Sequence, residues 1–293
     1  MKIKFWGVRG SIPCPGPHTV KYGGNTVCLE LRLKDTDRLI ILDAGSGIRE
    51  LGNYMMAHDL PKGPIRTEIF LTHSHWDHIM GFPFFTPNYI RGTKLKIYGP
   101  VTHEDDTLED VVGGQLTYRY FPVSQAELAS EIEYIDLKEG RYELGDGIML
   151  TTKYLNHPVV CLGYHFEYRG KVLCTAYDTE PFRNVFCTDP DDRSYDKAMA
   201  YEGERVAMEA NQQQEAFTAG ADLLIHDAQY TQEEYEASKV GWGHSSCEHA
   251  IASGKRAGVR RLALFHGGHP PDAQMGGRTL CRPAVRLAGQ EDR

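Results

Sequence analysis

The sequence lacks any long apolar run. Nowhere do about eighteen apolar residues follow one another, and the opening MKIKFWGVRGSIPCPGP has no apolar core long enough for a secretory signal. Both absences argue against a membrane-spanning helix and against export. We therefore expect a cytoplasmic protein with no membrane partner.

The sequence also lacks paired cysteines. Its seven cysteines are odd in number, scattered, and never spaced as Cys-x-x-Cys. A disulfide framework of a secreted protein and a zinc knuckle both show close, regular cysteine spacing. The pattern fits a reducing cytoplasm better than an oxidising compartment, and none of the cysteines resembles a metal knuckle.

Positive charge is in the minority. The chain has 32 lysines and arginines against 40 aspartates and glutamates, so its formal net charge is −8. Proteins that bind nucleic acid usually carry a basic patch that meets the phosphate backbone. The total gives no such electrostatic footprint, although a local basic patch can hide inside it. We expect nucleic acid to be a less favoured partner than a small molecule.

The sequence does have enough apolar material for one large core. With 293 residues and 41% hydrophobic content, a single domain spanning 1–293 is expected. Apolar runs predict strands at 2–8, 26–33, 39–42, 68–72, 94–98, 132–136, 148–154, 162–168, 172–176, 223–225 and 261–265, and helices at 48–57, 107–115, 204–219 and 246–257. This order predicts a layered α/β sandwich. The polar, acidic segment 187–197 predicts a surface loop or insertion.

Four metal-binding side chains crowd into positions 73–78, namely His73, His75, Asp77 and His78. Their nitrogen and oxygen donors suit zinc or a similar first-row metal. Alternation after the strand would place His73 and His75 on one side, and a turn would then let Asp77 and His78 face a neighbouring position. One short loop would thus serve two metals. The alternative, a polar surface loop with chance histidines, explains the close packing of donors poorly.

Further donors follow other predicted strands. His157 comes after the strand 148–154, Asp178 comes after 172–176, and His266 directly follows 261–265. Taken singly, each histidine would be an ordinary loop residue. Their shared position at the end of a strand predicts a site along one edge of a sheet, where α/β folds keep their chemistry.

The segment HSHWDH, with LDAGSG upstream and isolated His, Asp and His downstream, resembles the metallo-β-lactamase superfamily over about residues 3–270. The resemblance implies a four-layer αββα sandwich with two divalent metals, zinc first and manganese or iron as alternatives. It assigns His73, His75 and His157 to one metal, Asp77, His78 and His266 to the other, and Asp178 to both as a bridge. Asp43, in LDAGSG, either supports these ligands or caps the following helix.

Two more motifs resemble ribonuclease Z-type phosphodiesterases. Residues 226–229, HDAQ, resemble their HEAT segment with aspartate in place of glutamate, and residues 243–246, GHSS, resemble their HST segment. By this resemblance His244 protonates the leaving oxygen and Asp227 orients it, while hydroxide activated by the metals beside Asp77 attacks phosphorus. The spacing of Ser245 and Glu248 is that of a capping box, so a plain helix start is the alternative interpretation of GHSS.

The substrate is expected to be small. Ribonuclease Z carries a long Gly/Pro-rich arm that grips tRNA, whereas segment 103–145 here is mixed and partly acidic. The sequence therefore predicts a dinuclear phosphodiesterase acting on a small nucleotide or sugar phosphodiester, cyclic ones included. The alternatives are a lactone or thioester hydrolase of the same fold and an RNA-processing nuclease. Because dimers are common in this branch, we also expect a homodimer.

The remaining polar residues near these motifs carry no assignment. Arg9 and Asn25 fit turn positions beside the first hairpin better than substrate contacts. His226 is either a support for the site or a packed core residue, and His269 is left open.

Overall fold

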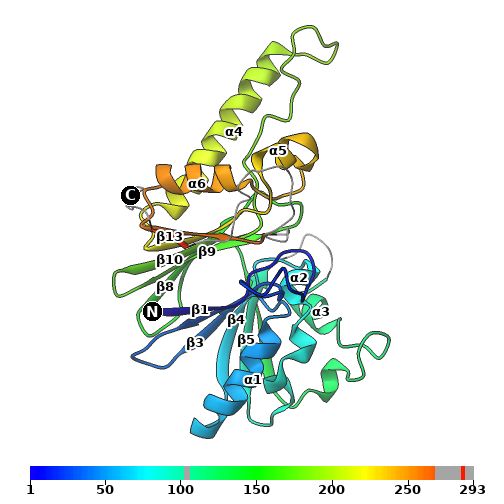
Figure 1. The fold of residues 1–293 in the computed structure, drawn as a ribbon, viewed down its shortest axis with the longest axis vertical. Coiled ribbons are helices and arrows are strands. Elements are labelled where there is room, and N and C mark those ends of the chain that lie inside the picture. The colour runs from blue at the N-terminus through cyan, green and yellow to red at the C-terminus, as the bar shows by residue number, and fades with distance from the viewer. Residues whose placement is uncertain (102–105, 268–284, 288–293) are drawn as a thin grey trace.

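The computed structural model describes residues 1–101 and 106–267, together with the backbone of 285–287. Its strands form two mixed sheets (Figure 1). The first sheet contains, in spatial order, β1 (Lys2–Gly7), β2 (Cys28–Arg32), β3 (Leu39–Leu42), β4 (Arg66–Phe70), β5 (Lys94–Pro100) and β6 (Glu131–Leu137). The second contains β13 (Val285–Leu287), β12 (Arg261–Phe265), β11 (Leu223–Asp227), β10 (Lys171–Ala176), β9 (Leu162–Tyr168), β8 (Ile148–Tyr154) and β7 (Gly140–Glu143).

Helices cover the outer faces of both sheets. The first sheet is covered by α1 (Ile48–His58) and α3 (Leu108–Gly113), and the second by α6 (Cys247–Arg256) and the end of α4 (Lys197–Thr218) (Figure 1). The short helix α2 (Trp76–Ile79) lies at the edge where the sheets meet, and α5 (Gln232–Glu234) lies beside α6. Short 3-10 turns lie at Leu60–Lys62, Phe82–Phe84, Thr86–Tyr89 and Gln125–Glu127, and a π-helical turn lies at Tyr235–Lys239. The predicted four-layer αββα sandwich is confirmed.

The apolar alternation of single strands explains the layering. In β3, Ile40 and Leu42 join the cluster between the sheets, whereas Leu39 and Ile41 join the cluster under α1. Successive side chains of a strand point to opposite faces, so one short apolar run serves two cores. Phe70 packs between the sheets against Phe166, with ring centroids 5.4 Å apart. Burying such a side chain contributes about 1.5–3 kcal/mol.

The strand directions bring several strand ends to one place. β10, β11 and β12 are parallel neighbours. β8 pairs antiparallel with β9, and β9 pairs antiparallel with β10, so β8 runs in the same direction as β10. The carboxyl ends of these strands therefore meet at one edge of the second sheet. In the first sheet, β3 and β4 are also parallel neighbours.

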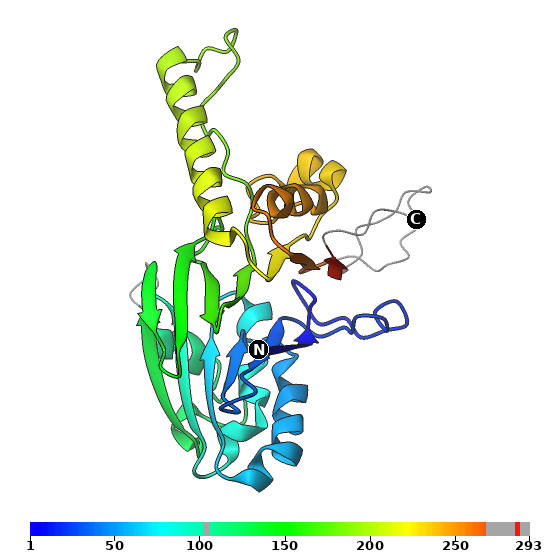
Figure 2. The same ribbon diagram turned by 90° about the vertical axis from the view of Figure 1, so that its left-hand side faces the viewer.

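The connection from β10 to β11 forms an arm. Figures 1 and 2 both show the first part of α4, and the loop before it, extending away from the sheets. Residues 188–194 are exposed, as the predicted surface loop requires. The helix begins at Lys197, seven residues earlier than the sequence predicted, because Asp196 accepts hydrogen bonds from the N–H groups of Ala198 and Met199 at 2.8 and 3.0 Å.

Within residues 1–101 and 106–267, no helix combines the length and the apolar character needed to cross a membrane.

Candidate metal centre

The run at 73–78 leaves β4 and turns directly into α2. His75 is extended and stands at the N-cap of α2, so Asp77 and His78 lie in the first turn of that helix. The predicted turn after residue 75 is thus a short helix. It separates the donors into two directions, as the sequence spacing predicted.

The first set of donors comes from three segments. Nitrogen and carboxylate atoms of His73, His75, His157 and Asp178 all lie within 4.8 Å of one another. His157 Nε2 is 3.0 Å from His75 Nδ1, and His73 Nε2 is 3.4 Å from Asp178 Oδ2. His73 and Asp178 are buried and His75 is partly exposed; the imidazole of His157 is buried too, although the residue as a whole is not.

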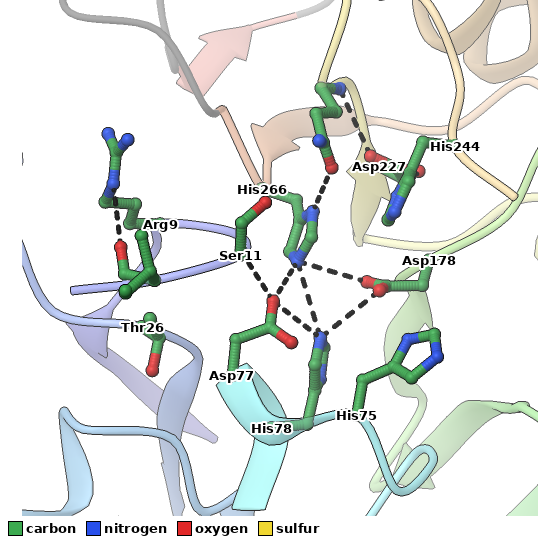
Figure 3. A network of polar contacts seen from close by, with 12 residues as sticks. Arg9, Ser11, Thr26, His75, Asp77, His78, Asp178, Asp227, His244 and His266 are labelled. Carbon is green, nitrogen blue, oxygen red and sulfur yellow. Dashed lines mark hydrogen bonds and ion pairs between the residues drawn. The ribbon is translucent and has the colours of Figure 1, made fainter. Parts of the chain in front are cut away.

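The second set lies beside the first and is fully buried. It contains Asp77, His78 and His266. His266 Nε2 is 2.9 Å from Asp77 Oδ2, and His78 Nε2 is 3.6 Å from the same oxygen. Asp178 stands between the sets, with one oxygen 3.3 Å from His78 Nε2 and the other 3.5 Å from His266 Nε2 (Figure 3). The structure brings together all seven residues that the sequence singled out.

Unpaired polar atoms show that these residues fit a metal. Among the described residues, His73 Nε2 and both oxygens of Asp178 are buried without a hydrogen-bond partner. A buried polar atom left unpaired costs about 1–3 kcal/mol, more when it is charged. Divalent cations such as zinc, manganese or iron accept imidazole nitrogen and carboxylate oxygen and would satisfy these atoms.

The protonation states of His73 and Asp178 also suit metal ligands. Burial and the neighbouring His78 hold the pKa of His73 well below its usual value, so its imidazole is neutral. Burial would raise the pKa of Asp178, but His266, His78 and His73 outweigh burial and hold that pKa well below its usual range. A neutral imidazole and an ionised carboxylate are the forms that bind metals.

Asp43 supports the second set. It follows β3 in a left-handed conformation, φ 59°, and is fully buried. Its carboxylate accepts hydrogen bonds from Thr72 N at 2.7 Å and from His78 Nδ1 at 2.8 Å. The helix-capping alternative is wrong, because the N-cap of α1 is Gly47 and no side chain caps it. Asp43 therefore holds Nδ1 of His78 and leaves Nε2 facing Asp178.

His244 lies at the edge of the cluster and is held by Asp227. His244 Nδ1 donates to Asp227 Oδ2 at 3.0 Å, and Ser245 N donates to the same oxygen at 3.0 Å. Asp227 is fully buried at the end of β11. Burial lowers the pKa of His244, but the charge of Asp227 and its hydrogen bond outweigh burial and raise that pKa to about 9. Asp227, although shorter than the glutamate of the HEAT segment, thus still reaches His244.

The capping box predicted after His244 is wrong in its register. Ser246, not Ser245, caps α6, with its hydroxyl accepting from His249 N at 3.1 Å. Ser245 is fully buried and its hydroxyl donates to the carbonyl of Thr179 at 2.6 Å. Glu248 accepts from Gln232 N at 3.1 Å instead of closing the box. The segment GHSS therefore starts helix α6 and also holds His244 in position.

Two supporting residues escaped the sequence analysis. Glu180 accepts from the N–H groups of Gly241 and Gly243 at 2.9 and 3.3 Å, and Gly243 O accepts from His157 Nδ1 at 2.8 Å. Gln229 Oε1 accepts from His266 Nδ1 at 2.8 Å. Glu180 follows Asp178 by two positions and Gln229 follows Asp227 by two, which is the one signal the sequence offered.

Other residues near the motifs lie outside the cluster. Arg9 Nε donates to Ile12 O at 3.0 Å, and the carbonyl of Asn25 accepts from Val8 N at 3.2 Å, as expected of turn residues. His226 is buried and donates to the carbonyl of Asp227 at 2.7 Å, so it is a packed core residue. His269 lies outside the described residues.

Seven donors gathered at the edges of two facing sheets, inside αββα layers, are typical of dinuclear metallohydrolases. Residues 22–216 match the sequence model of the metallo-beta-lactamase superfamily, which is more than half of the chain, and the chain belongs to that superfamily.

Named relatives extend this comparison. The chain is 28% identical over 297 residues to a ribonuclease Z of Lactococcus lactis subsp. lactis, covering 91% of this chain and 88% of the relative. It is also similar to the solved structure of the short form of human tRNase Z, with a TM-score of 0.58, 21% identity and coverage of 92% and 93%. A diphosphatase from the PhnP family gives a TM-score of 0.56 at 16% identity, with coverage of 92% and 87%. At these identities the solved structures show the fold alone.

Proposed function

We propose that this metal-dependent hydrolase is a dinuclear phosphodiesterase that cleaves a small nucleotide or sugar phosphodiester, with His244 as the general acid. The proposal follows the family of the chain and the names of its relatives, which are ribonuclease Z, tRNase Z and a PhnP-family diphosphatase. The two ligand sets proposed above would hold two divalent ions, zinc first, with manganese and iron as alternatives.

One observation supports phosphodiester cleavage more than any other: a histidine paired to a buried carboxylate faces the ligand sets. The His244 ring centroid is 4.9 Å from that of His266 and 5.3 Å from that of His157. One ligand atom each of Asp178, His244 and His266 lie within 4.8 Å of one another. A thioester hydrolase of this fold would not need a proton donor at this place, because its thiolate leaving group is stable as an anion.

The protein residues divide the chemistry between them. Bound divalent ions would supply an activated water and neutralise charge at phosphorus. Asp227 occupies Nδ1 of His244, so Nε2 is left to donate a proton to the departing oxygen. The pKa of about 9 keeps His244 protonated at neutral pH. Asp77 accepts from Ser11 N at 2.7 Å, which holds its carboxylate in place at the second set.

The charge of the arm favours a small substrate over RNA. Residues 181–218, from the start of the loop to the end of α4, contain four basic and eight acidic side chains. A surface that binds a polyanion gains affinity from basic groups and loses it from acidic ones. RNA is nevertheless the second candidate substrate, because ribonuclease Z relatives match over 91% of this chain.

The test compares His244→Ala with the unchanged protein on two kinds of phosphodiester. With an alkyl leaving group such as that of a cyclic mononucleotide, we expect kcat to fall by roughly 10²–10⁴-fold, because the departing alkoxide needs a proton. With bis(p-nitrophenyl) phosphate, whose leaving group is stable as an anion, we expect a much smaller loss. In the unchanged protein the rate on the alkyl substrate should fall at alkaline pH, as the pH rises past the pKa that Asp227 holds above the usual value for histidine, since His244 then loses its proton.

The metal content of His244→Ala should be measured together with its rates, so that a loss of metal is not mistaken for a loss of the general acid. If His244→Ala retains its metals and cleaves both substrates at the original rate, the general-acid role is refuted. A tRNA precursor in the same panel tests the second candidate. Cleavage of the tRNA precursor with no turnover of small phosphodiesters would replace the small-substrate proposal with RNA processing.

A further inference from the structure

A cavity of about 200 Å³ lies directly beside the first ligand set. It lies between the segment after β4, the end of β5, α2 and α3 on one side and the segment after His157 on the other. Among residues 1–101 and 106–267, its walls are formed by Leu71, His73, Ser74, Ile79, Pro100, Leu108, Val111, Pro158, Val159 and Val160. Complete small-ligand sites usually measure about 300–1,000 Å³, so this cavity has room for one chemical group and not for a whole dinucleotide.

The cavity shares a wall with the metal-ligand cluster. His73 lines the cavity, and its Nε2 lies 3.4 Å from Asp178 Oδ2 inside the cluster. Ser74 sits between His73 and His75 in the chain, and Pro158 directly follows His157. The rim of the cavity is therefore formed by chain neighbours of three proposed ligands, and a group bound there would lie next to a phosphoryl group at the metals.

The chemistry of the walls selects the kind of group. Of the ten lining residues within the described part of the chain, eight are apolar, and the polar ones are His73 and Ser74. A sugar placed here would lose water from several hydroxyls and find few hydrogen-bond partners, which opposes binding. A flat heteroaromatic ring presents apolar faces to such walls and only an edge that needs a polar partner, which Ser74 at the rim can supply.

We propose that this cavity binds the base of a nucleoside phosphodiester whose phosphoryl group lies at the metal-ligand cluster. The inference rests on the proposed function and narrows it, because it selects a nucleotide over a cyclic ribose phosphate or another sugar phosphodiester. It also separates the roles of two surfaces: the histidine cluster receives the phosphoryl group, and the loop 158–160 with α3 recognises the base.

Calorimetric titration of the metal-loaded protein with adenosine 5′-monophosphate, ribose 5-phosphate and octyl phosphate tests this assignment without relying on turnover. We expect the nucleotide to bind at least tenfold more tightly than the other two. Val111→Phe would fill the cavity from α3, where Val111 is only partly buried, and should remove this advantage while leaving the affinity for ribose 5-phosphate unchanged.

Two further variants guard against trivial effects. Val159→Phe fills the cavity from the opposite wall and should reproduce the loss if Val111→Phe disturbs α3. Val185→Phe makes the same change on the exposed loop before α4, where 87% of the side chain is accessible, and should bind the nucleotide normally.

Equal affinity for the nucleotide and ribose 5-phosphate in the unchanged protein would overturn the assignment. So would a nucleotide advantage that survives both cavity-filling variants, or octyl phosphate that binds as tightly as the nucleotide. If no phosphodiester is cleaved but the nucleotide advantage is present and depends on the cavity, the proposed function fails and the base-binding site stands.

Discussion

The two ligand sets share Asp178 but stand in different surroundings. The first set contains the partly exposed His75 and borders an apolar cavity. Asp77, His78 and His266 of the second set are all buried, and a carboxylate supports one of them from behind. The contrast teaches that two adjoining ligand sets can differ in access: the second set is closed to solvent, and the first is the side from which a substrate would approach.

The supports behind the imidazoles differ in the same way. In the second set, His78 donates to the buried carboxylate of Asp43. In the first set, His157 donates to a neutral carbonyl, Gly243 O, which is itself held in place by Glu180. A carboxylate partner makes an imidazole a stronger ligand than a carbonyl partner does. We therefore expect the second set to bind its metal more tightly.

The largest effect should come from the residue that the sets share. Asp178→Asn replaces the carboxylate between the sets with an amide, so the affinity for both metals should fall together. We expect hydrolysis to fall by on the order of 10³-fold, equivalent to about 4 kcal/mol of transition-state stabilisation. Elemental analysis and rates on bis(p-nitrophenyl) phosphate measure both effects.

Asp191→Asn is the matched control, because it makes the same change on the exposed loop before α4. It should keep its metals and its rate. If Asp178→Asn retained two metals per chain, the proposed role of Asp178 as a ligand of both metals would be ruled out.

A smaller effect should separate the two sets. Asp43→Asn removes the charge behind His78 but keeps an oxygen for Thr72 N, and asparagine tolerates the left-handed backbone at this position. We expect the affinity of one metal to fall by roughly 10–100-fold while the other is unchanged. Competition with a chromophoric zinc chelator resolves the two affinities. An equal loss at both sites would contradict the separation of the sets.

Much of this site could be predicted because its ligands follow apolar strands. The bounds of β3, β8, β9 and β12 agree with the sequence, since a buried strand leaves an apolar signature in its own residues. His157, Asp178 and His266 then fall at strand ends by simple counting. Their identity as ligands came from the resemblance to the superfamily.

The supports could not be found in this way. Glu180 contacts Gly241 and Gly243, which lie 61 and 63 residues away, and no local pattern in the sequence marks such a contact. The strand β7 was also missed, because its four residues, Gly-Arg-Tyr-Glu, contain no aliphatic side chain and are partly or fully exposed. The early start of α4 depended on Asp196, which is one of several acidic residues in its segment.

The smallest effect we predict concerns Glu180, which supports the first ligand set. Glu180→Gln keeps the size of the side chain, but one carboxylate oxygen becomes an amide nitrogen that cannot accept from the loop 241–243. That loop leads directly into His244, and its Gly243 carbonyl orients His157. Because Asp227 still holds His244, we expect only about a tenfold loss of kcat on a cyclic mononucleotide, equivalent to about 1.4 kcal/mol.

The leaving group distinguishes positioning from general damage. If Glu180 acts through His244, then bis(p-nitrophenyl) phosphate should be cleaved at nearly the original rate by Glu180→Gln, and both metals should stay bound. Glu204→Gln, on the exposed part of α4, is the control and should behave like the unchanged protein on both substrates. Equal losses on the two substrates, or a melting temperature lowered in step with the rate, would instead assign Glu180 to the stability of the fold.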